Sequence, residues 1–233
     1  MPDITIAAPD GGSFKAYLAM PAGTPAPGLV LIQEIFGVNQ VMRDLADGYA
    51  KQGYVVACPD LFWRIEPGVQ ITDKSQAEWD KAFELMNKFL PDFAKGVGDI
   101  QATITHVRGM KECTGKVGTV GYCLGGSLAY ATSFFTDSDA AVGYYPVQID
   151  DYLGQVPNIK KPLMLHIAEK DGFCPPESQK KIRDALAANK LCTAHSYPGV
   201  DHAFARAGGA NYNETTAKLA NERTFAFFKQ NLG

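Results

Sequence analysis

The chain has 233 residues, of which 46% are hydrophobic and 20% are charged. This length and composition suit one α/β domain of about eight strands and exclude an intrinsically disordered chain. The formal net charge is −3, and no segment is a run of like charge. We therefore expect neither nucleic acid nor an anionic membrane to be a main partner.

The N-terminal residues, and the spacing of the cysteines and histidines, indicate which further classes of protein are not expected. The N-terminus has no basic start followed by an apolar run, and no window reaches the roughly 18 apolar residues of a spanning helix. We expect a soluble, cytoplasmic monomer. The cysteines are far apart, lack a Cys-x-x-Cys pair, and have no metal-type spacing with the histidines, so we predict no disulfide scaffold, metal or cofactor. The cysteines are at positions 58, 113, 123, 174 and 192, and the histidines at 106, 166, 195 and 202.

Strand and helix patterns alternate along the chain. Residues 4–8 and 14–20 predict an antiparallel hairpin with its turn at Asp10-Gly11-Gly12. Short apolar runs predict buried strands, and helical patterns lie between them. This alternation predicts a mostly parallel sheet with helices on both faces. The further strands are expected at 28–33, 54–58, 116–120, 140–145, 162–168 and 193–197, and the helices at 39–52, 99–110, 124–135, 177–188 and 214–231.

One helix stands apart from this alternation. Trp79, Phe83, Met86 and Leu90 recur at helical spacing and form one apolar face. The preceding stretch, 62–74, contains a proline and a glycine and has little pattern, which indicates a surface loop. We expect a single domain over residues 1–233, with a small cap contributed by residues 62–92.

The most informative segment is the one that leads into the predicted helix 124–135. A predicted strand runs into Gly121-Tyr122-Cys123-Leu124-Gly125, and the helix follows directly. This is the nucleophile elbow of the α/β-hydrolase fold, in which small neighbours permit a tight turn. The N–H of Leu124 would lie at a helix N-terminus, which favours an oxyanion or a thiolate. A phosphate-binding turn is the alternative, but neither the dinucleotide-binding nor the P-loop spacing is present.

A nucleophile elbow predicts an acid and then a histidine later in the chain. Asp171 follows the predicted strand 162–168, and His202 lies between the last strand and the last helix. Asp201 is a rival acid, but it adjoins the histidine and its side chain should point elsewhere. A single loop aspartate or histidine is usually solvated or bridging, yet here the three residues occur jointly in the expected order. The sequence therefore predicts a triad with Cys123 as nucleophile, His202 as base and Asp171 as the orienting acid.

Glu34 is a further candidate at the end of the predicted strand 28–33. It precedes Ile35-Phe36-Gly37, where this fold places the second oxyanion donor. A carboxylate among apolar neighbours needs a raised pKa or a cationic partner, and Arg206 is available. The alternative is an ordinary exposed loop glutamate.

The chain resembles the dienelactone hydrolase (carboxymethylenebutenolidase) family over nearly its whole length. The resemblance implies that Cys123 attacks a lactone carbonyl to form an acyl-enzyme, that His202 moves the proton and that Asp171 orients His202. The matching segments are Gln-Glu-Ile-Phe-Gly-Val-Asn at 33–39, Pro-Asp-Leu at 59–61, Gly-Val-Gly-Asp at 96–99, Gly-Tyr-Cys-Leu-Gly-Gly at 121–126, Gly-Tyr-Tyr at 143–145, Asp171, His-Ala-Phe-Ala-Arg at 202–206 and Leu-Ala-Asn-Glu-Arg-Thr at 219–224.

The resemblance also implies roles around the triad. The backbone N–H groups of Ile35 and Leu124 would form the oxyanion hole. Glu34, held by Arg206, would pair with the resting thiol and take its proton once substrate binds. Arg206 would also contact the substrate carboxylate, and Tyr144 would line the pocket.

Phe36 and Trp79 complete the expected substrate-binding set, and Trp79 is a departure from the family pattern. Familiar members carry a second arginine on the cap helix at this position, and here only Lys81 is nearby. A lysine does not replace a bidentate arginine.

Three functions remain open at this point. The leading hypothesis is hydrolysis of an unsaturated lactone such as a dienelactone, giving maleylacetate. The alternative is a cysteine carboxylesterase or thioesterase of broader specificity on the same fold. With either function, the expected binding partner is a small lactone or ester substrate. A non-enzymatic binding protein is disfavoured by the intact triad spacing.

Overall fold

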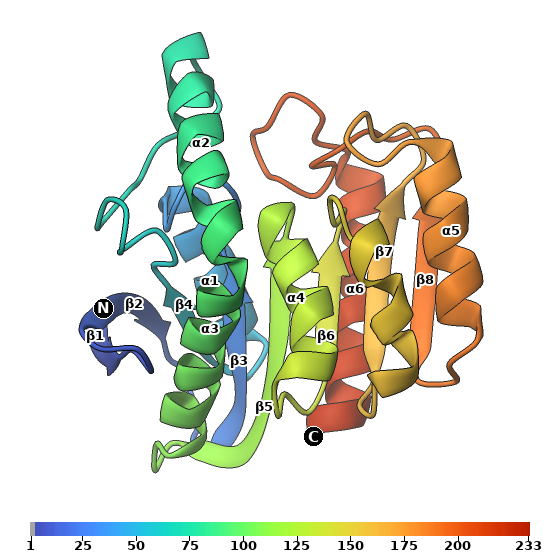
Figure 1. Ribbon diagram of the computed structural model, residues 1–233. Coiled ribbons are helices and arrows are strands. Elements are labelled where there is room, and N and C mark those ends of the chain that lie inside the picture. Colours follow the sequence, from blue (N-terminus) through green and yellow to red (C-terminus); the bar gives the residue numbers. More distant parts are fainter. Residues whose placement is uncertain (1–2) are drawn as a thin grey trace. The chain divides into compact units, whose positions relative to one another are not determined.

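The computed structural model describes residues 3–233, and the chain divides into two compact units (Figure 1). The first unit ends at Gly118 and the second begins at Thr119, so the boundary lies within strand β5 (Cys113–Tyr122). The expected single domain with a cap at 62–92 stays a prediction.

The first unit contains four strands of its own and three helices. Its strands are hydrogen-bonded in the order β1-β2-β4-β3, with β3 parallel to β4 and the other pairs antiparallel. The elements are β1 (Asp3–Ala7), β2 (Ser13–Ala19), β3 (Ala26–Ile32), α1 (Gln40–Lys51), β4 (Val55–Pro59), α2 (Gln76–Phe89), a 3-10 turn η1 (Leu90–Asp92) and α3 (Phe93–Arg108).

Strand alternation separates the two faces of this unit. Phe14 of β2 and Ile6 of β1 belong to a buried cluster that also packs against Ala102 of α3. Tyr17 points to the opposite face, where its hydroxyl donates to Asp47 Oδ1 of α1 at 2.9 Å. Since successive side chains of a strand face opposite sides, α1 and α3 cover opposite faces.

The second unit continues from β5 with three parallel strands in the order β5-β6-β7-β8. Leu163, Leu165 and Ile167 of β7 pack in one cluster with residues of α4, η2 and α5. His166, on the other face of the same strand, hydrogen-bonds Thr224 of α6. Figure 1 accordingly places α6 behind these strands and α4 in front. The elements are α4 (Leu124–Phe135), β6 (Ala141–Tyr144), a 3-10 segment η2 (Asp150–Asn158), β7 (Leu163–Ala168), α5 (Pro176–Ala187), β8 (Cys192–Tyr197) and α6 (Glu214–Leu232).

The expected mostly parallel sheet with helices is confirmed, and two details differ from expectation. The third helix begins at Phe93 and not at 99, because Gly96 and Gly98 lie inside it. A Cβ at Gly96 would lie 2.3 Å from the Phe89 ring, so this glycine permits close packing and does not mark a turn. The segment Asp150–Asn158 forms 3-10 turns that no periodic pattern predicted.

The segment 62–74 forms turns and is mostly exposed or half-buried, as expected for a surface loop, although Phe62 and Val69 are buried. Its backbone is tied to the loop after β3 by a bridge between Gly37 and Gln70.

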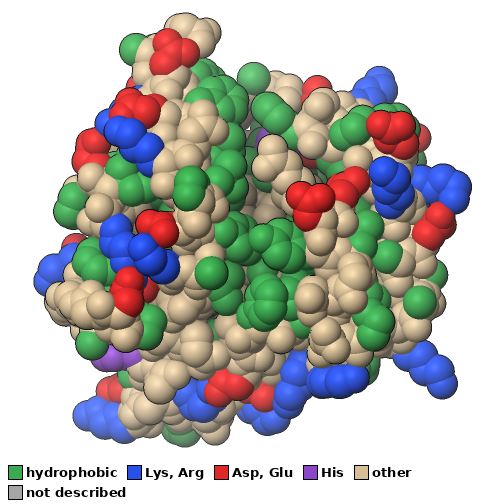
Figure 2. Space-filling model, in the orientation of Figure 1, with side chains coloured by type: hydrophobic (Ala, Val, Ile, Leu, Met, Phe, Trp, Pro, Cys, Tyr) green, Lys and Arg blue, Asp and Glu red, His purple; other side chains and the backbone are tan. Residues whose placement is uncertain are grey.

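The surface gives two further findings. Within residues 3–233, none of the helices has the length and apolar character needed to cross a membrane. On the face drawn in Figure 2, acidic and basic side chains are interspersed among apolar ones and do not gather in one large patch of either sign.

Candidate active site

Cys123 occupies a strained turn between β5 and α4. Its backbone has φ 57° and ψ −119°, a conformation that residues with a side chain rarely adopt. Its N–H donates to the Tyr144 carbonyl at 3.1 Å, and its carbonyl accepts from the Ser127 N–H at 3.2 Å. These bonds attach the turn to β6 on one side and to the first turn of α4 on the other. The turn therefore presents the thiol at the N-terminus of a helix, where negative charge is favoured.

The glycines around Cys123 are required by close backbone contacts. A Cβ at Gly121 would lie 1.9 Å from the carbonyl oxygen of Gly125. A Cβ at Gly126 would lie 2.4 Å from the Tyr144 carbonyl oxygen, and one at Gly143 would lie 2.7 Å from the Gly126 oxygen. Backbone atoms cannot give way as a flexible side chain can. The geometry thus explains why this turn needs small residues on both sides of Cys123.

Asp171 and His202 meet in two loops that follow neighbouring strands. Asp171 Oδ2 lies 2.8 Å from Nδ1 of His202, and Asp171 Oδ1 accepts from the Phe173 N–H at 2.9 Å. Both side chains are buried. The two loops are joined by backbone bonds from Glu169 to Tyr197 and from Lys170 to Val200, at 3.0 and 2.9 Å. The parallel pairing of β7 and β8 therefore sets the contact between acid and histidine.

The surroundings of His202 favour its protonated form. Burial lowers the pKa of the ring, but the charge and hydrogen bonding of Cys123 and Asp171 outweigh burial and raise the pKa of His202 to about 10. Nδ1 is engaged by Asp171. Among residues 3–233, however, Nε2 has no hydrogen bond that meets ordinary distance and angle limits. The thiol is thus close enough to raise the pKa of the ring by its charge and by a hydrogen bond that is longer or less well aligned than an ordinary one.

Two aromatic rings flank His202. The buried Tyr145 ring lies 5.0 Å from the His202 ring at 64°, and the Phe173 ring lies 4.9 Å away at 70°. The Asn211 side chain donates to the His202 carbonyl at 3.0 Å, which fixes the loop from the other side. Both edge-to-face contacts restrict rotation of the imidazole.

Tyr144 does not lie where we expected a pocket residue. Its side chain is fully buried and stacks on Tyr122, with ring centroids 4.5 Å apart. Its hydroxyl bonds to Asn221 Oδ1 and Thr224 Oγ1 of α6, at 2.9 and 2.7 Å. The physical reason is strand alternation within β6, since Ala141 packs in the cluster with α4 and α5 and Tyr144, three residues later, faces α6. Tyr145, one residue further on, is the tyrosine that contacts His202.

The other candidates of the second unit are Leu124 and Arg206. Leu124 is the first residue of α4, so its N–H is one of those without a partner inside the helix. Arg206 lies in the loop after His202, where its N–H donates to the Ala203 carbonyl at 2.9 Å, and it is 6% exposed. A buried guanidinium is a strong site for a carboxylate.

The first unit holds Glu34, Ile35 and Phe36, all buried in the loop that follows β3. Gln33 supports this loop, because its side chain accepts from the Leu61 N–H at 3.0 Å and donates to the Glu34 carbonyl at 3.3 Å. A Cβ at Gly37 would lie 1.9 Å from the Val69 carbonyl oxygen, so only glycine fits there. The glutamate is therefore held in a tightly packed backbone and is not an ordinary exposed loop residue.

Trp79 of α2 belongs to this aromatic part of the first unit. Its ring meets Phe36 edge-on, with centroids 5.0 Å apart, and stacks on Phe83 at 5.7 Å. Its indole N–H donates to the Asp73 carbonyl at 3.2 Å. The nearby Lys81 is paired with Glu66 at 2.6 Å. The charge of Lys81 is thus already paired with a carboxylate.

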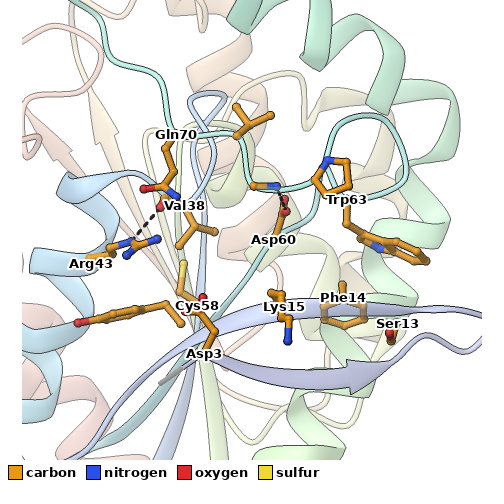
Figure 3. A pocket seen from close by; sticks show the side chains of 14 residues that line it. Asp3, Ser13, Phe14, Lys15, Val38, Arg43, Cys58, Asp60, Trp63 and Gln70 are labelled. Atoms are coloured by element: carbon orange, nitrogen blue, oxygen red, sulfur yellow. Dashed lines mark hydrogen bonds between the residues drawn. The ribbon is translucent and has the colours of Figure 1, made fainter. Parts of the chain in front are cut away.

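A separate cavity of about 280 Å³ occurs in the first unit (Figure 3). It is lined by Arg43, Cys58 and Asp60 among others, and by none of the residues predicted for the site. The carboxylate of Asp60 accepts from the N–H groups of Phe62 and Gly68, at 3.0 and 2.7 Å. These bonds make Asp60 an anchor for the loop that follows β4.

The part of the chain that the structure describes contains no group of three or more His, Cys, Asp or Glu side chains placed to hold a metal ion.

Solved structures share this fold over nearly the whole chain. A crystal structure described as a "Putative Dienelactone Hydrolase" from Klebsiella pneumoniae is 25% identical, covers 98% of each chain and has a TM-score of 0.86. A dienelactone hydrolase-like promiscuous phosphotriesterase from metagenomic libraries is 18% identical, has a TM-score of 0.82 and covers 100% of this chain and 99% of its own. With the elbow at Cys123, the likeness places the chain in the α/β-hydrolase class.

Sequence comparison identifies the family. The profile of the "Dienelactone hydrolase family" matches residues 14–232. A protein of Azospirillum brasilense named "Putative carboxymethylenebutenolidase" is 53% identical over 241 aligned positions, covering all of both chains. The carboxymethylenebutenolidase of Pseudomonas putida is 40% identical over 224 residues, covering 96% of this chain and 94% of its own. The chain belongs to the dienelactone hydrolase family and is a carboxylic ester hydrolase.

Sequence reasoning missed three residues that the geometry brings to this site. They are Tyr145, Phe173 and Gln179, whose side-chain nitrogen lies within 3.1 Å of the carbonyl oxygens of Ala168, Glu169 and Cys174. Tyr145 and Phe173 lie next to or near predicted site residues, and that proximity was their only signal. Gln179 looks like an ordinary helix residue in the sequence.

Proposed function

We propose that the protein hydrolyses an unsaturated lactone such as a dienelactone, giving maleylacetate, through Cys123, His202 and Asp171. The observation that carries the proposal is the 2.8 Å contact between Asp171 and His202 in the same unit as the strained Cys123 turn. Asp171 fixes the imidazole, and the pKa of His202, raised to about 10, favours an imidazolium beside a thiolate.

The proposed reaction has two stages. The Cys123 thiolate attacks the lactone carbonyl carbon, the ring C–O bond breaks, and a thioester forms while the leaving enol oxygen takes a proton from His202. Water then attacks the thioester carbonyl carbon while His202 takes a proton from that water, and the C–S bond breaks to release the carboxylic acid product and the Cys123 thiolate. The N–H of Leu124, at the first position of α4, would stabilise the oxyanion of both tetrahedral intermediates.

Glu34, Ile35 and Arg206 complete the proposal. Glu34 would hold the resting thiol and take its proton when substrate binds, Arg206 would bind Glu34 and the substrate carboxylate, and the N–H of Ile35 would be the second oxyanion donor. These roles come from the resemblance to the family, and Glu34 and Arg206 are both buried side chains.

A broader cysteine carboxylesterase or thioesterase is the second candidate. Trp79 favours it, because an aromatic ring lies where the resemblance places a second arginine, and Lys81 is paired with Glu66. Comparing cis- and trans-dienelactone with neutral aryl esters separates the two functions. A dienelactone hydrolase prefers the lactones, whereas the broader enzyme gains nothing from a substrate carboxylate.

The mechanism is tested by mass spectrometry of the intact protein mixed with substrate. We expect the wild type to gain the mass of one acyl group and Cys123→Ala to gain none. Cys192→Ala is the matched control, because it removes a partly buried thiol from the same unit and should still acylate. Turnover by Cys123→Ala at the wild-type rate would rule out the thioester route.

A further inference from the structure

Phe173 lies in the turn between β7 and α5, two residues after Asp171. Its ring is 51% exposed, which is unusual for a phenylalanine in this chain. Its N–H is held by Asp171 Oδ1 at 2.9 Å, so the carboxylate that binds His202 also fixes the backbone of Phe173. The exposed ring is therefore positioned by the catalytic acid and is not a loosely attached surface residue.

The two aromatic contacts of His202 differ in kind. Tyr145 is 1% exposed and also packs against Phe204, with ring centroids 5.5 Å apart, so its ring is part of the buried packing. The Phe173 ring lies 4.9 Å from the His202 ring and is 51% exposed. The exposed part of the Phe173 ring is therefore an apolar surface next to His202 that a substrate can contact.

We infer that Phe173 is a specificity-determining residue that contacts the unsaturated part of the substrate. An aromatic ring prefers flat, polarisable partners in stacked or edge-on geometry, and one such contact changes affinity by roughly 2- to 10-fold. Phe173 then favours conjugated lactones and aryl esters over saturated ones of similar size. This inference rests on the proposed function, since it assigns a substrate contact to the Cys123 site.

The test compares kcat/KM for a conjugated and a saturated substrate of similar size in three variants. Phe173→Ala should lower the conjugated-to-saturated preference by about 3- to 10-fold, and Phe173→Leu should lie between it and the wild type. Phe135→Ala is the matched control, because Phe135 is 54% exposed in the same unit but has no contact with the triad residues. It should leave the preference unchanged.

Two results would overturn the inference. An equal loss for both substrates in Phe173→Ala would mean that the ring only packs against His202, and no loss for either would mean that it is an idle surface group. Failure of the proposed function looks different, since Cys123→Ala would then stay active whatever Phe173 does. If only simple esters are cleaved, the same comparison is made with an aryl and an alkyl ester.

Discussion

Two neighbours, Asp171 and Cys123, raise the pKa of His202, and they act on the ring in different ways. Asp171 binds Nδ1 directly at 2.8 Å, whereas Cys123 acts on the ring mainly through its charge. A change at Cys123 must therefore change the pKa of the imidazole. The pKa of His202 in the folded protein is therefore well above the ordinary value for a histidine.

Removal of the thiol should therefore lower the pKa of His202. We expect the ring of Cys123→Ala to lose its proton below the value of about 10 that applies to the wild type, because the charge on Cys123 is the largest cause that raises this pKa. The ring resonances followed by NMR between pH 5 and 11 measure this shift. Cys192→Ala should titrate as the wild type does. An unchanged pKa in Cys123→Ala would assign the whole effect to Asp171.

The same shift links His202 to stability. Since the folded state binds the proton more tightly than the unfolded state, the stabilisation is complete below the unfolded pKa near 6.5 and is lost as pH rises towards 10.

At this scale the sequence predicted a triad, of which the structure shows the contact between Asp171 and His202, but it did not predict the surroundings of these residues. Cys123, Asp171 and His202 follow from a motif with a fixed chain order, and that order does not depend on side-chain direction. Tyr144 and Tyr145 could not be separated, because a displacement of one residue along a strand turns the side chain to the other face. Strand β6 ends at Tyr144, and Tyr145 has φ 37°, a local conformation that the sequence did not reveal.

The β5–α4 turn is the element on which the site depends, and its glycines are not interchangeable with alanine. In an ordinary helix, replacing glycine by alanine is favourable. Here Gly126→Ala should destabilise the protein by roughly 1–3 kcal/mol, because the new Cβ meets the Tyr144 carbonyl, which is also the acceptor for the Cys123 N–H. Urea unfolding and kcat measure the two effects.

Gly154→Ala provides the control for that experiment. Gly154 lies in η2 of the same unit, and a Cβ there would meet nothing within 4 Å. We expect its stability and kcat to remain close to those of the wild type. Equal behaviour of the two variants would contradict the steric account of the turn.

The loop that carries Asp171 is supported from helix α5 by Gln179. Gln179→Leu should lower stability by roughly 1–3 kcal/mol, because three loop carbonyls lose a buried donor. It should also lower kcat, since Asp171 would no longer be held against His202. Lys180→Leu, on the exposed side of the same helix, should change neither. A destabilised Gln179→Leu with wild-type kcat would mean that Gln179 supports the fold alone.

Elements with a strong period were predicted well, and those shaped by packing were not. Helix α4 was predicted from its sequence with the bounds that the structure has. The start of α3 was placed too late because glycine usually ends helices, whereas Gly96 here makes room for Phe89. The 3-10 turns of η2 span only nine residues and include Pro157, which is too short and interrupted a segment for a helical period to be recognised in the sequence.

Across the whole molecule, buried titratable groups respond to acid with opposite sign, as Asp60 and His166 show. In the first unit, burial raises the pKa of Asp60 above its ordinary value. Its folded state takes up a proton before the unfolded state does, so this contribution to stability grows as pH falls. In the second unit, His166 is fully buried between Tyr197 and Thr224, at 2.7 and 2.9 Å, and burial holds its pKa well below the ordinary value. The unfolded chain binds a proton that folded His166 does not bind, so the contribution of His166 to the stability of the folded state decreases as pH falls.

The sensitivity of the second unit to mild acid should therefore depend on His166. Between pH 7.5 and 5.5 the unfolded histidine gains a proton worth about 1 kcal/mol, and the folded one does not. We expect the wild type to lose about 1 kcal/mol more of its unfolding free energy over this range than His166→Gln, whose amide still hydrogen-bonds but does not titrate. Urea unfolding at the two pH values measures the difference. His106→Gln, at an exposed position of the first unit, should behave as the wild type does. If His166→Gln loses as much stability as the wild type, then His166 does not cause the acid sensitivity, and hydrogen exchange should find the first protection lost outside β6, β7 and α6.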